Sequence, residues 1–316
     1  MRGELEPGSS ALLAAVRNSG LPPTHQLPVE QARALMRDRR AVTQAPVTGS
    51  VKAGDREVDI DGRQISVRIY RPLTTDHAAP LPGVVYYHGG GWTIGDLDVY
   101  DAALRDLCAL TGALVLSVDY RLAPEHPFPA AVDDGWAALR WARAHASALG
   151  IDPLRMAVAG DSAGANLATV AALLERDAGS PALKCQLLIY PVTDLRAQTA
   201  SYDEPSDRQL MTAETMHWFI GHYTPDAAQR LDWRASPLIR DDLSGLPPAV
   251  VITAGFDPLR DEGRAYADRL SSAGVSTTYV CFERQVHGFI TMTRVTPEAL
   301  AAWRFAAAEL RHALAA

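Results

Sequence analysis

Gly160-Asp161-Ser162-Ala163-Gly164 is the stretch that decides the fold, because it matches the G-x-S-x-G pattern of a serine held on a sharp turn. An apolar run at residues 156–159 precedes the motif and predicts a strand, and residues 163–175 follow it with a helical pattern. Such a turn strains the serine backbone and projects its hydroxyl from the carboxyl edge of a sheet. Glycine at the two outer positions avoids collisions with the adjoining strand and helix. The motif in this context predicts that Ser162 is a nucleophile.

The segments on either side of the motif predict an α/β fold. Short, continuous apolar runs indicate strands that are buried on both faces, which is typical of a parallel sheet covered by helices. These runs lie at residues 83–87, 113–118, 156–159, 187–190 and 249–253, and a last strand is expected at 276–282. Helical segments separate most of them, at residues 101–110, 130–148, 163–175 and 261–273, and a C-terminal helix is expected over 297–314. The alternation predicts a doubly wound, mostly parallel sheet of about eight strands with helices on both faces.

An antiparallel edge is expected before the first parallel strand. Residues 56–60 are followed by Asp61-Gly62, a dipeptide typical of a hairpin turn. The next run, residues 64–71, alternates apolar and polar side chains. Because alternation implies one solvated face, we expect this hairpin to lie at the edge of the sheet.

The interval between residues 190 and 249 interrupts the alternation of strands and helices, because it contains no clear strand. Within it, residues 208–222 predict a helix rich in large apolar side chains, which suits a cap over a substrate site. The alternative is a pair of surface helices packed on the core. We expect residues 1–50 to form N-terminal helices that contribute to the cap, residues 51–195 and 236–316 to form the catalytic core, and residues 196–235 to form the cap insertion.

Composition and charge exclude several classes of protein. The 316 residues are 47% hydrophobic and 21% charged, with a net charge of −7, as in an ordinary globular protein. They offer no clustered Lys and Arg for nucleic acid or an anionic membrane. No run approaches the roughly 18 apolar residues of a transmembrane helix, and residues 11–16 are too short for the core of a signal peptide. We expect a cytoplasmic protein without a nucleic-acid or membrane partner.

Three cysteines, Cys108, Cys185 and Cys281, lie far apart in the chain. They show no CxxC or zinc-finger spacing, so neither a disulfide framework nor a metal site is predicted. At least one thiol must be free, because the number is odd, and this fits a reducing compartment. We expect all three to be buried as small hydrophobic side chains.

His287 is the histidine whose place in the chain suits a general base for Ser162. An alcohol needs a base to become a nucleophile, and in this fold the chain order of a triad is serine, acid, histidine. His287 follows the last expected strand, on a loop at the carboxyl edge. His217 and His222 fall in the expected cap, and His312 falls on the C-terminal helix. The alternative for His287 is a loop histidine with only local hydrogen bonds.

Asp257 is the candidate acid, because it follows the strand expected at residues 249–253. Its role would be to fix the tautomer of the imidazole and to stabilise the imidazolium. Asp261 and Glu262 are rivals, but they fall where a helix should start and where carboxylates complement the helix dipole. Pro258 favours an extended conformation at Asp257 and so keeps it off that helix.

A tetrahedral intermediate also needs hydrogen-bond donors for its oxyanion. The segment His88-Gly89-Gly90-Gly91-Trp92 directly follows an expected strand and matches an HGGG-type oxyanion segment. The N–H of Ala163, directly after the nucleophile, is the expected second half of the hole. A flexible turn or a phosphate loop is the alternative, although no G-x-x-x-x-G-K-[ST] pattern is present. We expect His88 to orient the loop and Trp92 either to line the pocket mouth or to pack under the cap.

Taken together, these segments resemble the bacterial hormone-sensitive-lipase-like carboxylesterases. The resemblance rests on segments in the family's order, at residues 88–92, 119–131, 160–164, 257–263 and 287–289. It covers the chain from about residue 55 onward. One departure is Ala165, where the family usually has another glycine; we expect it to affect helix packing slightly and chemistry little. The proline-dense stretch 120–129 resembles the family's loop that buttresses the site.

The resemblance implies an α/β-hydrolase fold with a helical cap, no cofactor, and hydrolysis of small-molecule esters with short to medium acyl chains. It assigns Gly90 and Gly91 as oxyanion donors together with Ala163, with Gly89 a less favoured contributor. It also implies a homodimer. We further expect four side chains to line the substrate pocket: Trp92, Tyr190, Met211 and Trp218.

Two other functions fit the same sequence. An amidase or peptidase would use the same three residues, because fold and triad do not separate esters from amides. A non-catalytic binding protein of hydrolase fold is the second alternative. Such proteins typically lack a member of the triad, whereas candidates for all three members are present in this chain.

Overall fold

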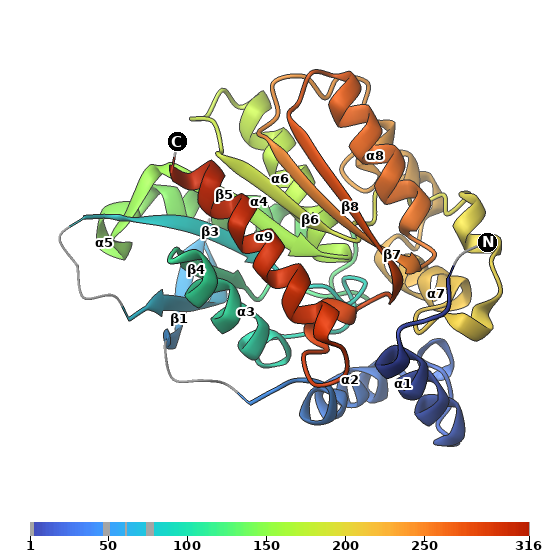
Figure 1. The fold of residues 1–316 in the computed structure, drawn as a ribbon. Helices are drawn as coiled ribbons and strands as arrows, with labels where there is room; N and C mark the ends of the chain where they lie inside the picture. Colours follow the sequence, from blue (N-terminus) through green and yellow to red (C-terminus); the bar gives the residue numbers. More distant parts are fainter. Residues whose placement is uncertain (1–2, 47–50, 61, 74–78, 316) are drawn as a thin grey trace.

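An eight-stranded sheet forms the centre of the computed structural model, which describes residues 3–46, 51–60, 62–73 and 79–315 (Figure 1). The strand order is β1-β2-β4-β3-β5-β6-β7-β8. Pairing is antiparallel between β1 and β2 and between β2 and β4, and it is parallel elsewhere, so the predicted fold class is confirmed. The strands are β1 Val51–Ile60, β2 Arg63–Pro72, β3 Leu81–Tyr87, β4 Leu114–Val118, β5 Ile151–Asp161, β6 Cys185–Ile189, β7 Ala249–Phe256 and β8 Thr277–Val286.

Helices cover both faces of this sheet (Figure 1). Helices α3 and α9 pack on one face, and α4, α6 and α8 pack on the other. The α-helices are α1 Pro7–Asn18, α2 Val29–Thr43, α3 Leu97–Thr111, α4 Ala130–Ala144, α5 Ala146–Leu149, α6 Ala163–Asp177, α7 Ala213–Tyr223, α8 Arg260–Ser272 and α9 Pro297–Ala315. Short 3-10 helices lie at Thr24–Gln26, Ala200–Asp203, Ser206–Arg208, Ala227–Leu231, Pro237–Ile239 and Phe289–Thr291.

The central strands are buried on both faces, as their continuous apolar runs predict. Successive residues of β6 alternate between two apolar layers: Leu188 packs in the layer with α4, α6 and α8, and Leu187 and Ile189 pack in the layer with α3 and α9. Cys185 is buried as expected. Cys281 is only partly buried, because β8 is the last strand of the sheet and no strand covers its outer edge.

Several element boundaries differ from the sequence expectations. The helix expected over 130–148 is divided at His145 into α4 and α5. The helix expected from residue 208 begins at Ala213, because Thr212 caps it by accepting a hydrogen bond from the Thr215 N–H at 3.3 Å. Strands β5 and β8 are longer than their apolar runs. The expected hairpin joins β1 to β2, with Ile60 opposite Arg63, and Asp61 of its turn lies outside the described residues.

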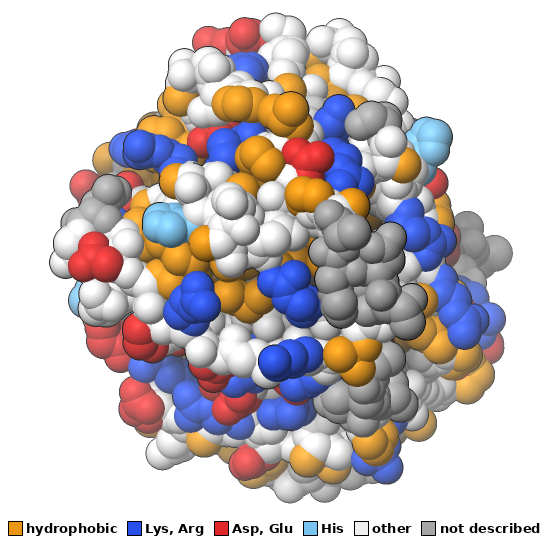
Figure 2. All heavy atoms as spheres, turned by 90° about the vertical axis from the view of Figure 1, so that its left-hand side faces the viewer, with side chains coloured by type: hydrophobic (Ala, Val, Ile, Leu, Met, Phe, Trp, Pro, Cys, Tyr) orange, Lys and Arg blue, Asp and Glu red, His pale blue; other side chains and the backbone are white. Residues whose placement is uncertain are grey.

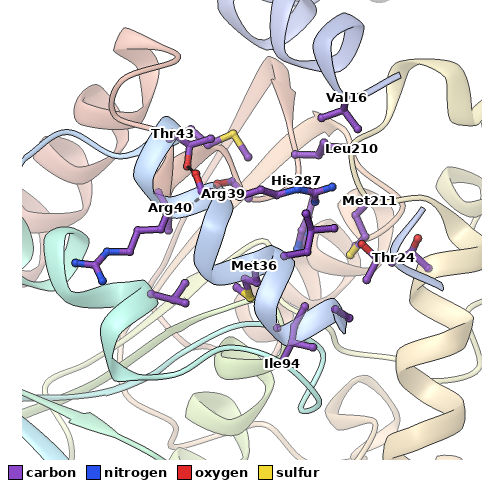
Figure 3. Close-up of a pocket in the computed structure, with 18 of the residues that line it drawn as sticks. Val16, Thr24, Met36, Arg39, Arg40, Thr43, Ile94, Leu210, Met211 and His287 are labelled. Carbon is purple, nitrogen blue, oxygen red and sulfur yellow. Dashed lines mark hydrogen bonds between the residues drawn. The ribbon is translucent and has the colours of Figure 1, made fainter. Parts of the chain in front are cut away.

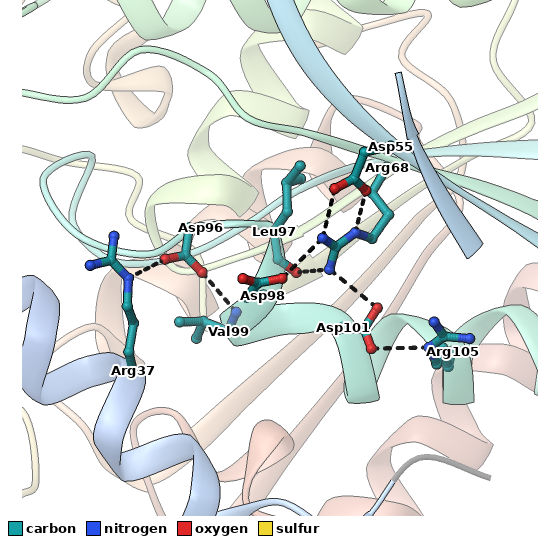
Figure 4. Close-up of polar contacts among 9 residues, drawn as sticks. All are labelled: Arg37, Asp55, Arg68, Asp96, Leu97, Asp98, Val99, Asp101 and Arg105. Carbon is teal, nitrogen blue, oxygen red and sulfur yellow. Dashed lines mark hydrogen bonds and ion pairs between the residues drawn. The ribbon is translucent and has the colours of Figure 1, made fainter. Parts of the chain in front are cut away.

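Arg68 fastens the antiparallel edge of the sheet to α3 (Figure 4). Its guanidinium pairs with Asp55 of β1 at 2.5 Å, with Asp98 at 2.9 Å and with Asp101 at 3.3 Å. The hydrogen bond with Asp55 raises the pKa of Arg68 above its ordinary value. Asp96 caps the start of α3 by accepting from the Val99 N–H at 2.8 Å. These ion pairs therefore hold the β1–β2 hairpin, whose outer face is solvated, to the start of α3.

The N-terminal segment packs against the end of β8, far away in the sequence. The Glu6 N–H donates to the Arg284 carbonyl at 2.9 Å, and the Ser9 hydroxyl donates to the Gln285 side chain at 2.8 Å. Further along, the Arg294 N–H donates to the carbonyl of Thr43 at 2.9 Å. These bonds hold α1 and α2 beside the C-terminal part of the chain, near α7 (Figure 1).

The surface carries mixed charge. Figure 2 shows basic and acidic side chains interspersed over one face of the molecule, with hydrophobic side chains in small groups between them. Across the described ranges, no helix combines the length and the apolarity that crossing a bilayer demands. Within the same ranges, His, Cys, Asp and Glu side chains form no group of three that could hold a metal ion.

The two-layer packing predicts how the sheet responds to a truncated side chain. Leu188 is fully buried, so Leu188→Ala leaves a cavity and should lower the free energy of unfolding by about 2–5 kcal/mol. Leu231 is 64% exposed, so Leu231→Ala should change it by less than about 0.5 kcal/mol. Equilibrium unfolding in urea measures both variants. Equal losses would contradict the assignment of Leu188 to the core.

Candidate active site

Ser162 stands on the turn between β5 and α6 and has the strained backbone that its motif predicts. Its φ is 55°, in the left-handed region that residues other than glycine rarely adopt. A Cβ at Gly164 would lie 1.9 Å from the Tyr87 carbonyl oxygen, and one at Gly160 would lie 2.3 Å from the Gly164 carbonyl oxygen. Glycine at these two positions therefore allows α6 to start directly against the sheet.

The structure brings Ser162, His287 and Asp257 together in one hydrogen-bonded chain. His287 Nε2 lies 3.1 Å from Ser162 Oγ, and His287 Nδ1 lies 2.8 Å from Asp257 Oδ2. Asp257 is fully buried, and its Oδ1 accepts from the Leu259 N–H at 2.9 Å. The Asp257 bond favours a proton on Nδ1 of the imidazole, which leaves Nε2 free to accept one from the serine. A base is thus within hydrogen-bond reach of an alcohol.

The rival carboxylates and histidines lie elsewhere. Asp261 pairs with Arg260 at 2.7 Å. Glu262 is fully buried, and its Oε1 accepts from the N–H groups of Thr193 at 2.6 Å and Asp194 at 3.2 Å. The other histidines weighed from the sequence are on α7 or on the exposed side of α9, at positions 217, 222 and 312.

The three glycines of the loop after β3 differ in whether their N–H groups are already hydrogen-bonded. The Gly89 N–H is already bonded to Asp161 Oδ1 at 2.9 Å and to the Tyr100 hydroxyl at 3.1 Å. The N–H groups of Gly90 and Gly91 find no acceptor in the described part of the chain. Both residues line the same cavity as Ser162, and a Cβ at Gly91 would lie 2.1 Å from the Phe219 ring. Ala163 is the first residue of α6, where helix N–H groups have no intrahelical acceptor.

Asp161 links this loop to the serine turn, a role that the sequence reasoning missed. Its Oδ1 accepts from the Tyr86 hydroxyl and the Gly89 N–H, each at 2.9 Å, and its Oδ2 accepts from the Tyr100 hydroxyl at 2.9 Å. Burial raises the pKa of this carboxyl, while the tyrosine hydrogen bonds oppose the shift. The available signal was an aspartate inside a motif of otherwise small residues, to which the sequence analysis gives no role.

His88 and the proline-dense stretch 120–129 pack against each other beside the glycine loop. His88 is fully buried, its Nδ1 lies 2.8 Å from the Gly89 carbonyl, and its ring stacks on Tyr120 at 4.4 Å. The Tyr120 hydroxyl donates to the His88 carbonyl at 2.7 Å. The peptide bonds Ala123-Pro124 and Phe128-Pro129 are cis. The stretch expected to buttress the site therefore contacts the residue before the glycines.

A cavity of about 390 Å³ opens onto Ser162 and His287 (Figure 3). Most of its walls are apolar and come from α1, α2, α7 and the loops beside them. The apolar lining includes Leu12, Val16, Leu35, Met36, Ile94, Leu210, Met211, Phe219 and Met292. Met211 therefore lines the cavity, as expected from the sequence.

The other three expected pocket residues do not line this cavity. Trp92 is fully buried and stacks on the last tyrosine of α7 at 4.1 Å, so of the two roles considered for it the structure has the packing one. Tyr190 is also fully buried and packs beside the His287 ring at 4.4 Å. Trp218 is half-buried on α7, and the cavity side of that helix presents Phe219 instead. Hydrophobic character alone did not reveal which way these rings point.

Comparisons with known proteins identify relatives of this chain. A family model described as "alpha/beta hydrolase fold" matches residues 84–291. Carboxylesterase NlhH from Mycobacterium tuberculosis is 44% identical over 292 residues, which is 90% of each chain. Ethyl acetate hydrolase from Pseudomonas putida is 37% identical over 297 residues, or 91% of this chain and 92% of that protein. A solved ester-hydrolase from the metagenome of Lake Arreo, in complex with a derivative of bipyridine phosphonate, is 41% identical with a TM-score of 0.93, covering 99% of this chain and 100% of that one.

The chain belongs to the α/β-hydrolase fold family. Within that family, its relatives bear out the resemblance to the hormone-sensitive-lipase-like carboxylesterases that the motifs indicated.

The buried carboxyl of Glu262 predicts a pH-dependent stability. Burial raises its pKa from the usual 4.5 to about 8. The folded protein therefore binds more protons than the unfolded chain between these values, and its stability falls as the pH rises through them. Glu262→Gln cannot ionise at this position. The free energy of unfolding of the variant, relative to that of the parent, should therefore grow with pH by up to about 1.4 kcal/mol per pH unit. Urea unfolding at several pH values between 4.5 and 8 measures this difference.

The exposed Glu283 supplies the control. Glu283→Gln should follow the pH profile of the parent. Parallel profiles for the parent and Glu262→Gln would show that Glu262 is already ionised in the folded protein.

Proposed function

We propose that this protein is a carboxylesterase that hydrolyses small-molecule esters through an acyl-enzyme formed on Ser162. The observation that carries the proposal is the hydrogen-bonded chain from Ser162 through His287 to Asp257. The carboxylesterase and ethyl acetate hydrolase named above, which share this family, support ester hydrolysis as the reaction. The triad chemistry needs no cofactor.

In the first half of the reaction, Ser162 Oγ attacks the ester carbonyl carbon while His287 Nε2 takes the hydroxyl proton. The carbonyl oxygen becomes an oxyanion, which accepts hydrogen bonds from the N–H groups of Gly90, Gly91 and Ala163. Asp257 stays ionised and stabilises the imidazolium. The intermediate then collapses: the bond to the alkoxy oxygen breaks, and His287 returns its proton to the leaving alcohol.

In the second half, water replaces the alcohol. His287 takes a proton from the water as its oxygen attacks the acyl-enzyme, and the same N–H groups hold the second oxyanion. Collapse releases the carboxylic acid, and His287 returns the proton to Ser162. Each proton taken by His287 is given back within the same half-reaction, so the enzyme is restored.

The substrate range follows from the cavity. We infer that α1 and α2 act with residues 196–235 as a cap, because α1, α2 and α7 all contribute to the wall around Ser162. Its apolar lining and bounded volume favour short and medium acyl chains. The cytoplasm and a homodimer remain our expectations for location and assembly; the three free thiols are compatible with a reducing compartment.

Ser162→Ala tests the nucleophile. We expect kcat/KM for p-nitrophenyl butyrate to fall by several orders of magnitude, up to about 10⁶-fold, because the triad acts as a unit. Labelling by a fluorophosphonate probe should disappear with it. Ser272→Ala, on the exposed side of α8, should leave both readouts unchanged. Parental activity in Ser162→Ala, or a parent protein that does not label, would refute the proposed mechanism.

A panel of substrates tests the reaction class and the acyl range. Among p-nitrophenyl esters from acetate to palmitate, we expect kcat/KM to peak at short or medium chains and to be lowest for palmitate. Esters should also react faster than their matched p-nitroanilides. Faster turnover of the amides would favour an amidase, and a maximum at palmitate would contradict the inferred size of the cavity.

A further inference from the structure

Helix α2 places a charged side chain in the mostly apolar lining of the cavity. Most residues of α2 that line the cavity follow helical spacing, at Ala32, Leu35, Met36, Arg39 and Thr43. Four of these side chains are uncharged, and the fifth is an arginine; Arg40 and Val42 of the same helix also line the cavity. Arg39 thus occupies a position that the helical repeat assigns to the cavity wall.

The Arg39 guanidinium has no partner of its own. Among the described residues, no carboxylate lies within ion-pair distance of it, and it donates no hydrogen bond. The side chain is half-buried, and burial lowers its pKa below the ordinary value, with no neighbouring acid to oppose the shift. Figure 3 shows Arg39 reaching into the cavity, whereas Arg40 points away from its centre.

Two other arginines of α2 are neutralised by acids of the chain. Arg33 pairs with Glu125 at 2.7 Å, and Arg37 pairs with Asp96 at 2.6 Å (Figure 4). The carboxylate that lines the cavity, Asp161, already accepts three hydrogen bonds. The protein therefore provides acids to two arginines of α2 that lie outside the cavity, whereas Arg39 lines the cavity without an acid.

A cation that is partly removed from water and has no counter-ion loses solvation without compensation. A carboxylate is the group that a guanidinium fork matches best, through two parallel charge-assisted hydrogen bonds. Ser162 and Arg39 line the same, mostly apolar cavity, which suits the hydrocarbon chain of a substrate. The cavity thus combines a serine within reach of a base, apolar walls and a guanidinium without a partner.

We propose that Arg39 binds a carboxylate carried on the acyl chain of the substrate, so that the preferred substrates are half-esters of aliphatic dicarboxylic acids. This inference rests on the proposed ester hydrolysis at Ser162. Arg39 acts as a specificity-determining residue: it pairs with the distant carboxylate while the ester carbonyl lies at Ser162. The alternative, an arginine whose stem packs on the wall while its head remains solvated, requires no anionic substrate.

The test compares two substrates that differ only in the distant charge. These are p-nitrophenyl esters of aliphatic dicarboxylic acids, from adipate to sebacate, with the second carboxyl either free or capped as a methyl ester. At neutral pH, we expect the parent enzyme to have about a tenfold or greater preference in kcat/KM for the free acid at the best-fitting length. The preference should appear mainly in KM.

Variants at two neighbouring arginines separate binding from packing. Arg39→Met should abolish the preference for the free acid while retaining the kcat/KM for the capped ester. Arg39→Lys should restore part of the preference, because it keeps the charge but loses the fork. Arg40→Met, at the next residue of the helix, should keep the preference for the free acid, because Arg40 also lines the cavity but points away from its centre (Figure 3). The unesterified dicarboxylic acid should compete with p-nitrophenyl butyrate in the parent and inhibit Arg39→Met more weakly.

The outcomes distinguish this inference from the proposed function. If the parent cleaves capped esters but does not prefer the free acid at any length, Arg39 does not bind a substrate carboxylate and ester hydrolysis stands. Equal losses on both substrates in Arg39→Met would assign the residue to packing and overturn the inference. If neither capped nor free esters are cleaved, the proposed function fails, and the inference fails with it.

Discussion

The main chain at Ser162 has a φ of 55°, and it can persist there only because the surrounding strands fix it from both sides. Strand β5 lies between β3 and β6, with Gly160 beside Tyr87 and Asp161 beside Ile189. The Ser162 N–H donates to the Ile189 carbonyl at 2.8 Å. This turn determines where the hydroxyl points and where α6 begins, and the histidine and the glycine loop must be arranged around it.

Asp161 extends this constraint to the neighbouring loop. Its carboxylate accepts hydrogen bonds from Tyr86 on β3, from Tyr100 on α3 and from the first glycine of the loop. A buried carboxyl with three donors is expensive to disrupt, because each donor would lose its partner in an environment of low dielectric. The same bonds occupy the N–H of Gly89 and leave those of Gly90 and Gly91 available. One side chain therefore sets both the position of the loop and which of its donors face the cavity.

Much of the fold and the core of the site could be predicted from the sequence, and the reason is topological. The carboxyl ends of parallel strands meet at one edge of a sheet, so residues that follow β5, β7 and β8 must lie close together. Chain order was then enough to pair Ser162 with Asp257 and His287. The pocket was less predictable: Trp92 and Tyr190 are as apolar as Met211, but their directions depend on packing against α7 and against His287. Arg39 could not be distinguished from other arginines of its amphipathic helix, because its lack of a partner is a property of the folded chain.

The bonds between the N-terminal segment and the end of β8 have a consequence for how the protein is made. Ser9 and Gln285 are 276 positions apart, so α1 leaves the ribosome long before the strand that anchors it exists. Until then α1 lacks these bonds, although α2 can already pair with Asp96 and Glu125, and contacts between such distant segments form late. A nascent chain that stops before β8 would contain the serine but not His287 or the anchor for α1. The enzyme can thus become active only when its synthesis is nearly complete.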